Sequence, residues 1–149
     1  MKTIAQQLGI TKFPFYIKDD NGNLIYHEYS DGWWEKREFD AEGNEVYYEN
    51  STGYWWKKEF DAEGNAVYYE DSDGYWQKHQ FDDANNSVYY ETSNGYWWKR
   101  EFDAEGDEVY YERSTGYIFD NRPKGKAMAK VTEARKLLEQ AEKELKEQA

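Results

Sequence analysis

The 149-residue chain is strongly acidic: 31 Asp and Glu residues face 19 Lys and Arg residues, for a net charge of -12. Affinity for a phosphate backbone comes from clustered Lys and Arg, so this balance excludes general nucleic-acid binding. The absence of cysteine excludes disulfides and thiolate metal sites. There is no apolar run of membrane-spanning length and no secretory signal in the first residues. We therefore expect a soluble chain without membrane contact, cytoplasmic if expressed as given.

Aliphatic residues are scarce, but large aromatic residues are abundant. Leu, Ile, Val and Phe together number 22 of 149, a share that at this net charge is typical of disordered chains. The chain also has 15 Tyr and 7 Trp, and each large ring can bury about 150–250 Å². Because these rings recur in register along the chain, we predict a folded, mainly β protein.

Residues 1–11 are predicted to form a helical cap. The segment "KTIAQQLG" reads as a short amphipathic helix with Ile4, Ala5 and Leu8 on its apolar side. Such a helix covers the first edge of a repeat array, where an unpaired strand would otherwise be exposed.

Residues 12–119 are predicted to form five β-hairpin repeats of 21 residues each. The period is marked by a glycine column at Gly32, Gly53, Gly74, Gly95 and Gly116, and by a phenylalanine column at Phe39, Phe60, Phe81 and Phe102. Each unit contains two turn signals, such as "DAEG" and "NSTG", and short segments rich in aromatic residues and Val between them. We expect an antiparallel meander that forms an elongated, twisted, single-layer sheet. Asn85 replaces the turn glycine in one copy, and Asn tolerates the left-handed conformation best after Gly.

Alternation along the strands assigns side chains to faces. It places a tryptophan column on one face together with a lysine column, and leaves Tyr54, Trp56, Lys58 and Phe60 on the other. Whether Phe39 shares a face with Val46 or with Tyr47 depends on the length of the turn loop, and the sequence leaves this open.

Residues 123–149 are predicted to form an amphipathic α-helix with Val131, Ala134, Leu138, Ala141 and Leu145 on one stripe. This segment has a net charge of +2 and the remainder of the chain has -14. The helix is a candidate for docking on the acidic array. Self-association could occur through this helix or through a sheet edge. The segment is rich in Ala, Glu, Lys and Leu, residues that protein designers choose for their high helix propensity. The sequence is therefore compatible with a natural origin and with an engineered or consensus origin.

The motifs of catalysis and metal binding are missing. His27 and His79 occupy non-equivalent columns, and the serines are turn residues. The segments 19–23 and 71–74 resemble fragments of calcium loops but lack the bidentate Glu, and turn chemistry explains their composition. The glutamates in the column of Glu49 are predicted to pair with lysines across the sheet, and not to form the two-carboxylate catalytic pair of a glycosidase. We therefore predict no catalytic residue, no metal site and no cofactor.

The aromatic columns are the candidate binding or stacking surface. Rings exposed in register bind sugars by stacking or cations through their faces, whereas rings covered by neighbours act as the core. The candidate residues are Trp34, Trp55, Trp76, Trp97, Tyr47, Tyr68, Tyr89 and Tyr110.

The motif Phe-Asp-x-x-Gly-Asn, as in "FDAEGN" at residues 39–44 and 60–65, resembles the Tyr-Asp repeats of Rhs-type shell proteins, with Phe in place of Tyr. The layout of one hairpin per repeat also resembles MORN-type arrays. "VYYENSTGYW" is similar in texture to aromatic choline-binding repeats but lacks their Gly-Trp opening. These resemblances imply stacked hairpins and transfer no catalytic residue. We expect a non-enzymatic scaffold or protein-interaction module, with an aromatic module for carbohydrate or choline-like ligands as the alternative.

Overall fold

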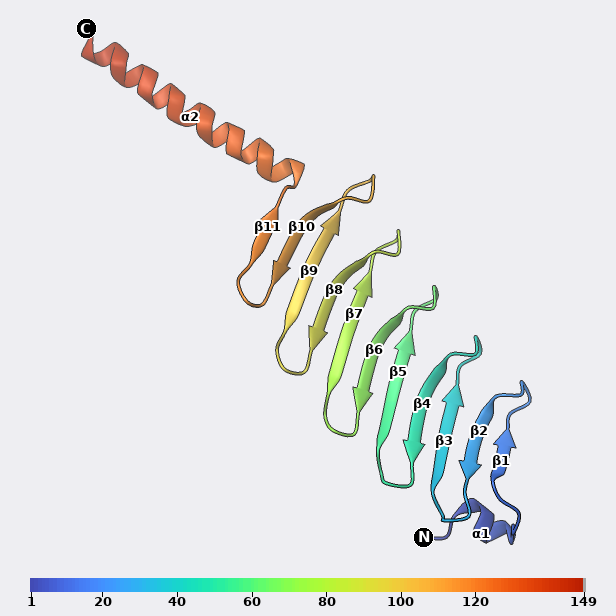
Figure 1. Cartoon of the computed structure of the whole chain (residues 1–149). Helices are drawn as coiled ribbons and strands as arrows, with labels where there is room; N and C mark the ends of the chain where they lie inside the picture. Colours follow the sequence, from blue (N-terminus) through green and yellow to red (C-terminus); the bar gives the residue numbers. More distant parts are fainter. Residues whose placement is uncertain (149) are drawn as a thin grey trace. The chain divides into compact units, whose positions relative to one another are not determined.

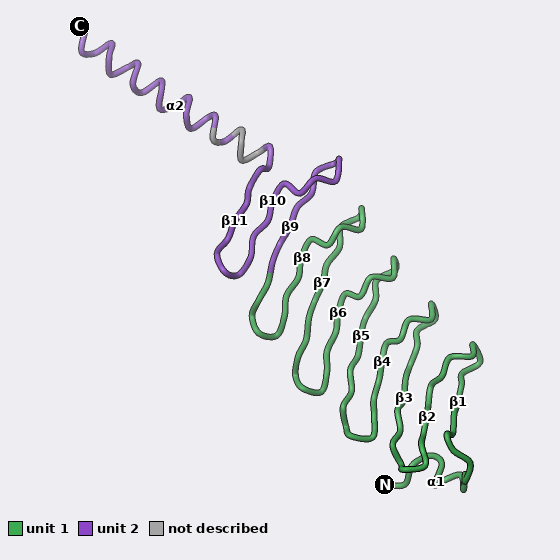
Figure 2. Tube along the Cα trace, viewed as in Figure 1, with its two compact units in different colours: residues 1–97 green, residues 98–149 purple. Residues whose placement is uncertain are grey.

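The computed structural model describes residues 1–148, apart from the side chains of residues 124–127 and 129. The chain divides into two compact units, residues 1–97 and residues 98–149 (Figure 2). Each unit is described by itself below.

The first unit combines a short helix with an antiparallel sheet. The helix α1 spans Ile4–Leu8 and is capped by Thr3. The strands β1 to β8 follow in chain order, each paired antiparallel with the next (Figure 1). They span Phe15–Lys18, Leu24–Glu28, Trp34–Phe39, Glu45–Asn50, Trp55–Phe60, Ala66–Asp71, Trp76–Phe81 and Ser87–Thr92.

The second unit contains three strands and the long C-terminal helix. Strand β9 spans Trp97–Phe102, and all but its first residue belong to this unit. Strand β10 (Glu108–Arg113) pairs antiparallel with β9 and with β11 (Ile118–Asp120), and α2 spans Pro123–Glu147. The prediction of a mainly β hairpin meander with a short N-terminal and a longer C-terminal helix is confirmed. Neither helix is long and apolar enough, in its described residues, to cross a membrane.

The turns form because aspartate and glycine occupy the positions that the backbone requires. In the second turn of this type, the Asp40 carboxylate accepts hydrogen bonds from the backbone N–H groups of Glu42 (3.1 Å) and Asn44 (2.8 Å). Gly43 closes the turn at a φ of 88°, in the left-handed region that favours glycine. Asn85 takes the equivalent position in the fourth copy at a φ of 66°, which confirms its predicted role.

One extra residue in each hairpin determines which residue lies opposite Phe39. Glu38 pairs with Tyr47, whereas the next residue, Phe39, pairs with Glu45, so Val46 is the additional residue of a β-bulge. Phe39 therefore opposes neither Val46 nor Tyr47. The same shift recurs at Phe60 and Ala66 and at Phe81 and Ser87.

We expect Gly64→Val to destabilise the chain by more than about 1 kcal/mol, because a β-branched residue is strained at positive φ. Gly64 has a φ of 86°, and a Cβ built there meets nothing within 4 Å, so backbone strain alone accounts for the loss. Urea melts would measure it. Gly64→Asn is the matched control and should lose clearly less; equal losses for Val and Asn would contradict this explanation.

Burial in this fold differs from that of a layered protein. Among the described residues, Ala5 and Tyr26 are the only buried hydrophobic side chains, and most rings of the sheet are half-buried. Side chains on neighbouring strands therefore cover one another, because the sheet of the first unit has no second layer packed along it.

Candidate functional site

The predicted Trp and Tyr columns of the first unit meet on one face of its sheet. Trp34, Trp55 and Trp76 lie directly opposite Glu28, Glu49 and Glu70 on the preceding strands. Tyr47 and Tyr68 lie opposite Lys57 and Lys78. Residues directly opposite in an antiparallel pair share a face. We call this surface the Trp–Glu face; it comprises the Trp34, Trp55 and Trp76 column, the Tyr47, Tyr68 and Tyr89 column, and the Glu and Lys residues beside them.

Each tyrosine of this face donates a hydrogen bond to the glutamate two residues later. The distances are 3.2 Å for Tyr47 and Glu49, 3.1 Å for Tyr68 and Glu70, and 3.0 Å for Tyr89 and Glu91. Burial, followed by this hydrogen bond, raises the pKa of all three tyrosines. The hydroxyl groups are therefore held neutral and serve as donors to the carboxylates.

Cationic side chains of the chain itself lie over the rings of the Trp–Glu face. The Lys36 ammonium is 5.5 Å from the Tyr47 ring centroid, and the Lys78 ammonium is 4.9 Å from that of Trp76. Lys57 lies 5.7 Å from the Trp55 ring and forms an ion pair of 3.0 Å with Glu70. These distances are within the range of cation–π attraction. The ring faces that a cationic ligand would need are thus in contact with lysines already.

All eight predicted site residues are half-buried, but the structure does not gather all of them into one described site. Six lie on the strands β3 to β8. Trp97 begins β9 at the end of the first unit, and Tyr110 lies on β10 in the second unit.

A second set of rings, on the opposite face of the first unit, was not among the predicted site residues. Tyr48 stacks on Trp56 (centroids 5.9 Å apart, planes at 12°), and Trp56 stacks on Tyr69 (6.4 Å, 28°). The Lys58 ammonium lies 4.3 Å from the Trp56 centroid, and the hydroxyls of Tyr54 and Tyr69 are 3.3 Å apart. We call Tyr48, Tyr54, Trp56 and Tyr69 the stacked-ring face. The signal in the sequence was the second residue of each Tyr-Tyr and Trp-Trp pair, which alternation sends to this side.

The first unit also has an apolar groove between α1 and the first three strands. Its volume is about 680 Å³, and its lining includes Ile4, Ile17, Ile25, Trp34 and Phe39. Ligand pockets are commonly about 300–1,000 Å³ and mostly apolar. Trp34 is therefore the one member of the predicted Trp column that also lines this groove.

Glu28 anchors the helix that forms one wall of the groove. Its side chain is 1 % exposed and accepts hydrogen bonds from the Thr3 hydroxyl, the Ala5 backbone N–H (3.0 Å) and the Tyr26 hydroxyl (2.8 Å). Burial alone raises the pKa of Glu28, but the hydrogen bonds from Thr3, Ala5 and Tyr26 outweigh it and hold that pKa below its usual value. Burial and the bond to Glu28 raise the pKa of Tyr26 to about 12. The helix is thus fastened to β2 by an ionised carboxylate.

We expect acid to release α1 from the sheet. Because the pKa of Glu28 is lower in the folded chain, the folded state binds fewer protons, and this stability is present above about pH 4.3 and lost as the pH falls through the lowered value. Melting temperatures recorded from pH 6 downward would measure the loss. Glu28→Gln should make the curve shallower below about pH 4.3; identical slopes for both chains would contradict the assignment.

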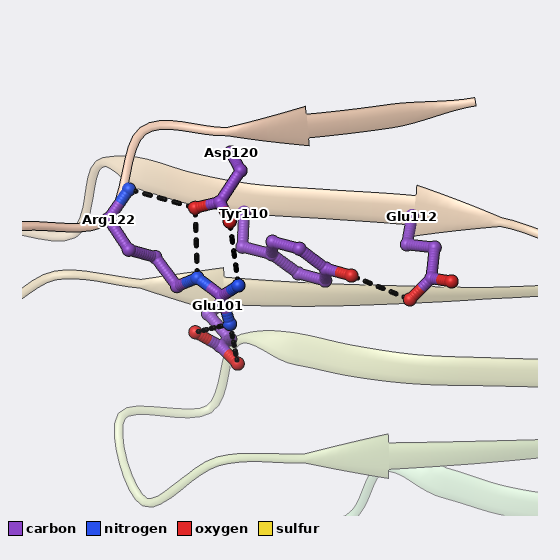
Figure 3. A network of polar contacts seen from close by, with 5 residues as sticks. All are labelled: Glu101, Tyr110, Glu112, Asp120 and Arg122. Carbon is purple, nitrogen blue, oxygen red and sulfur yellow. Dashed lines mark hydrogen bonds and ion pairs between the residues drawn. The ribbon is translucent and has the colours of Figure 1, made fainter. Parts of the chain in front are cut away.

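In the second unit, Arg122 covers the last ring of the Tyr column (Figure 3). Its guanidinium lies 4.1 Å from the Tyr110 ring centroid and donates to the Asp120 carboxylate at 2.7 Å and to that of Glu101 at 3.3 Å. Tyr110 donates to Glu112 at 2.6 Å. The bond to Asp120 raises the pKa of Arg122, so the cation is permanent. Asp120 stands where earlier repeats have a lysine, and Arg122 supplies the cation in its place.

The histidines and acidic turns show structural contacts. His27 is buried between the rings of Tyr16 and Tyr29, with centroids 4.6 and 4.2 Å away. Burial lowers the pKa of His79, whose ring lies 4.6 Å from that of Tyr90. The Asp19 carboxylate accepts backbone hydrogen bonds within its own turn, at 2.9 and 2.8 Å, as turn chemistry predicts. Among the described residues, no three His, Asp or Glu side chains are grouped in a way that could hold a metal ion.

Comparison with known proteins places the fold but not the family. No family model matches the sequence, and no curated protein matches it either. A crystal structure of TcdB2-TccC3-TEV is similar in fold, with a TM-score of 0.50 and 11 % sequence identity over 76 % of this chain. This chain spans 6 % of the length of that one. The similarity supports the predicted β-hairpin repeat fold and does not distinguish among the repeat types that the sequence resembles.

Proposed function

We propose that this chain is a non-enzymatic β-hairpin repeat that serves as a scaffold or protein-interaction module. The observation that carries the proposal is the recurrence of one arrangement on the Trp–Glu face: a tyrosine bonded to a glutamate, and a ring covered by a lysine. The rings are already in contact with the chain's own cations, so their first role is to hold the sheet together. What the sheet offers a partner is the periodic charged surface above the rings.

The open faces of the sheet suit such a role. In the first unit, the lysines of the Trp–Glu face are exposed, as are Glu38 and Glu59, whereas the glutamates opposite the tryptophans are half-buried or, at Glu28, buried. An extended partner with alternating charge would meet the same side chains at regular intervals, which is how repeat proteins use their surfaces.

The groove beside α1 favours a second candidate function, the binding of an aromatic-stacking ligand such as a carbohydrate or choline. It is the place in the first unit where a ring of the predicted column, Trp34, lines a cavity of ligand size. Tyr26 lies against Trp34 with centroids 6.1 Å apart, so a ligand entering the groove would change the environment of both rings.

A titration with choline and a panel of soluble glycans distinguishes the two functions. The scaffold role predicts unchanged Trp emission and melting temperature throughout the panel. A ligand that raises the melting temperature and shifts the emission in the parent chain and in Trp76→Phe, but not in Trp34→Phe, would locate ligand binding at the groove and overturn the scaffold role.

A further inference from the structure

The C-terminal helix α2 carries an apolar stripe that the described residues of the second unit leave uncovered. Val131, Leu138 and Leu145 are 45 %, 61 % and 70 % exposed, and every side chain from residue 130 to residue 148 is exposed. Together with Ala134 and Ala141, they follow one another at alternating spacings of three and four residues. This is the repeat of a coiled-coil seam, which brings a/d side chains onto one side of a helix.

We propose that α2 pairs antiparallel with α2 of a second copy of this chain. The large and small residues of the seam favour this direction. Large side chains occupy one seam position and alanines the other, so antiparallel helices place large side chains against alanines. In the register that we propose, Leu138 lies against Ala134 of the second copy and Val131 against Ala141. Parallel helices would place alanine against alanine and leave space between the helices, which close packing disfavours.

Charge on the flanks of the seam favours the same direction. The antiparallel alignment brings Lys130 beside Glu144 of the second copy, and by symmetry forms this pair twice. The same alignment also brings Arg135 beside its own copy, one repulsive contact against two attractive ones. A parallel pair would instead bring Lys130 beside Arg135 twice, with repulsion at both places. At the centre of the antiparallel pair, Leu137, which is 63 % exposed, lies beside its own copy and extends the covered apolar surface.

The sheet edge is a weaker surface for self-association. Strand β11 is three residues long, Ile118–Asp120, and short edge strands are a device by which proteins avoid edge-to-edge pairing. The helix pairing depends on α2 alone, so it would hold whichever function of the sheet is correct.

Cysteine crosslinking tests the direction directly, since the chain has no cysteine of its own. In the antiparallel pair, residue 131 of one copy faces residue 141 of the other, and the two copies of residue 131 are about 15 Å apart along the axis. A mixture of full-length Val131→Cys and Ala141→Cys chains should therefore give the mixed product with a short bis-maleimide, identified by peptide mass. Each variant alone should give little product. Efficient product from Val131→Cys alone would show parallel helices, and no product from any sample would show that residues 131 and 141 do not face each other; either overturns the proposal.

Sedimentation velocity over about 10 to 500 μM tests the contacts. The parent chain should show concentration-dependent dimers, and Leu138→Glu should weaken dimerisation at least about tenfold. Lys136→Gln changes the net charge by the same amount on the outer side of α2 and should stay within about twofold. A monomeric parent chain, or equal effects of the two variants, would overturn the proposal.

Charge reversal supplies a matched test of the flanking pair. Lys130→Glu should weaken the dimer about five- to tenfold, because it places Glu beside Glu144 of the second copy, and adding Glu144→Lys should restore it. In a parallel pair Lys130→Glu would instead strengthen association, by relieving repulsion from Arg135. Circular dichroism of each variant confirms that the helix is retained.

Discussion

Glu28→Ala should destabilise the folded chain by about 3 kcal/mol, one of the two largest effects expected of single side chains in the sheet. The substitution removes the acceptor of three hydrogen bonds at a site that is 1 % exposed. The Ala5 N–H and the Tyr26 hydroxyl would then be left without this partner in a buried place, and an unsatisfied buried donor costs more than the net gain of its bond. Urea melts at neutral pH, followed by far-UV circular dichroism, would measure the loss.

Glu49→Ala is the matched control, since Glu49 occupies the same column one repeat later. It is half-buried and accepts from Tyr47 at 3.2 Å, so we expect a loss below about 1 kcal/mol. Glu28→Gln keeps the size of the side chain and should fall between the two. Equal losses at positions 28 and 49 would show that α1 is not fastened through this carboxylate.

The special role of Glu28 could not be predicted from the sequence, although its position in the glutamate column could. The column alone makes it equivalent to Glu49, Glu70, Glu91 and Glu112. What distinguishes it is α1, because the Thr3 hydroxyl and the Ala5 backbone N–H donate to the carboxylate. A contact between residues 25 positions apart depends on how the helix packs on the sheet, and the helix pattern of Ile4, Ala5 and Leu8 does not contain that information.

The hairpins were predictable because their signals are local. The turn requires an acceptor at Asp40 for its backbone hydrogen bonds and a positive φ at Gly43. Both requirements arise within a few residues of sequence, so the sequence predicts the turn. The partner of Phe39 could not be read, because one bulged residue, Val46, decides it, and either register keeps the same alternation on each strand.

The exposure of the aromatic rings is intermediate between the two predicted alternatives, a covered core and an exposed binding surface. They are neither a buried core nor a free stacking surface, because lysines from the chain lie over half-buried rings. This outcome depends on the length of the lysine side chain, whose stem packs on apolar surface while its charge stays in water. Alternation predicts which face a lysine is on, but not that it folds back over Trp76 at 4.9 Å.

The stacked-ring face leads to the second large effect: Trp56→Ala should destabilise the chain by about 2–4 kcal/mol. Trp56 has Tyr48 stacked on one side, Tyr69 on the other and the Lys58 ammonium above it. Removing the indole leaves both tyrosine rings without their central neighbour, and the surrounding strands are too fixed by their ladders to close the space. The loss should be below that of a fully buried Trp, because the ring is half-buried.

Two variants show whether stacking is the cause. Trp56→Phe keeps an aromatic ring between the tyrosines and should lose less than half as much as Trp56→Ala. Lys58→Met keeps the stem and removes the charge, so it should cost about 0.5–1 kcal/mol, the usual value of a cation–π contact that solvent still reaches. Urea melts of the three chains would measure these differences. If Trp56→Ala lost less than about 1 kcal/mol, the rings would contribute little to holding adjacent hairpins together, and the aromatic columns would be free to act as a ligand surface.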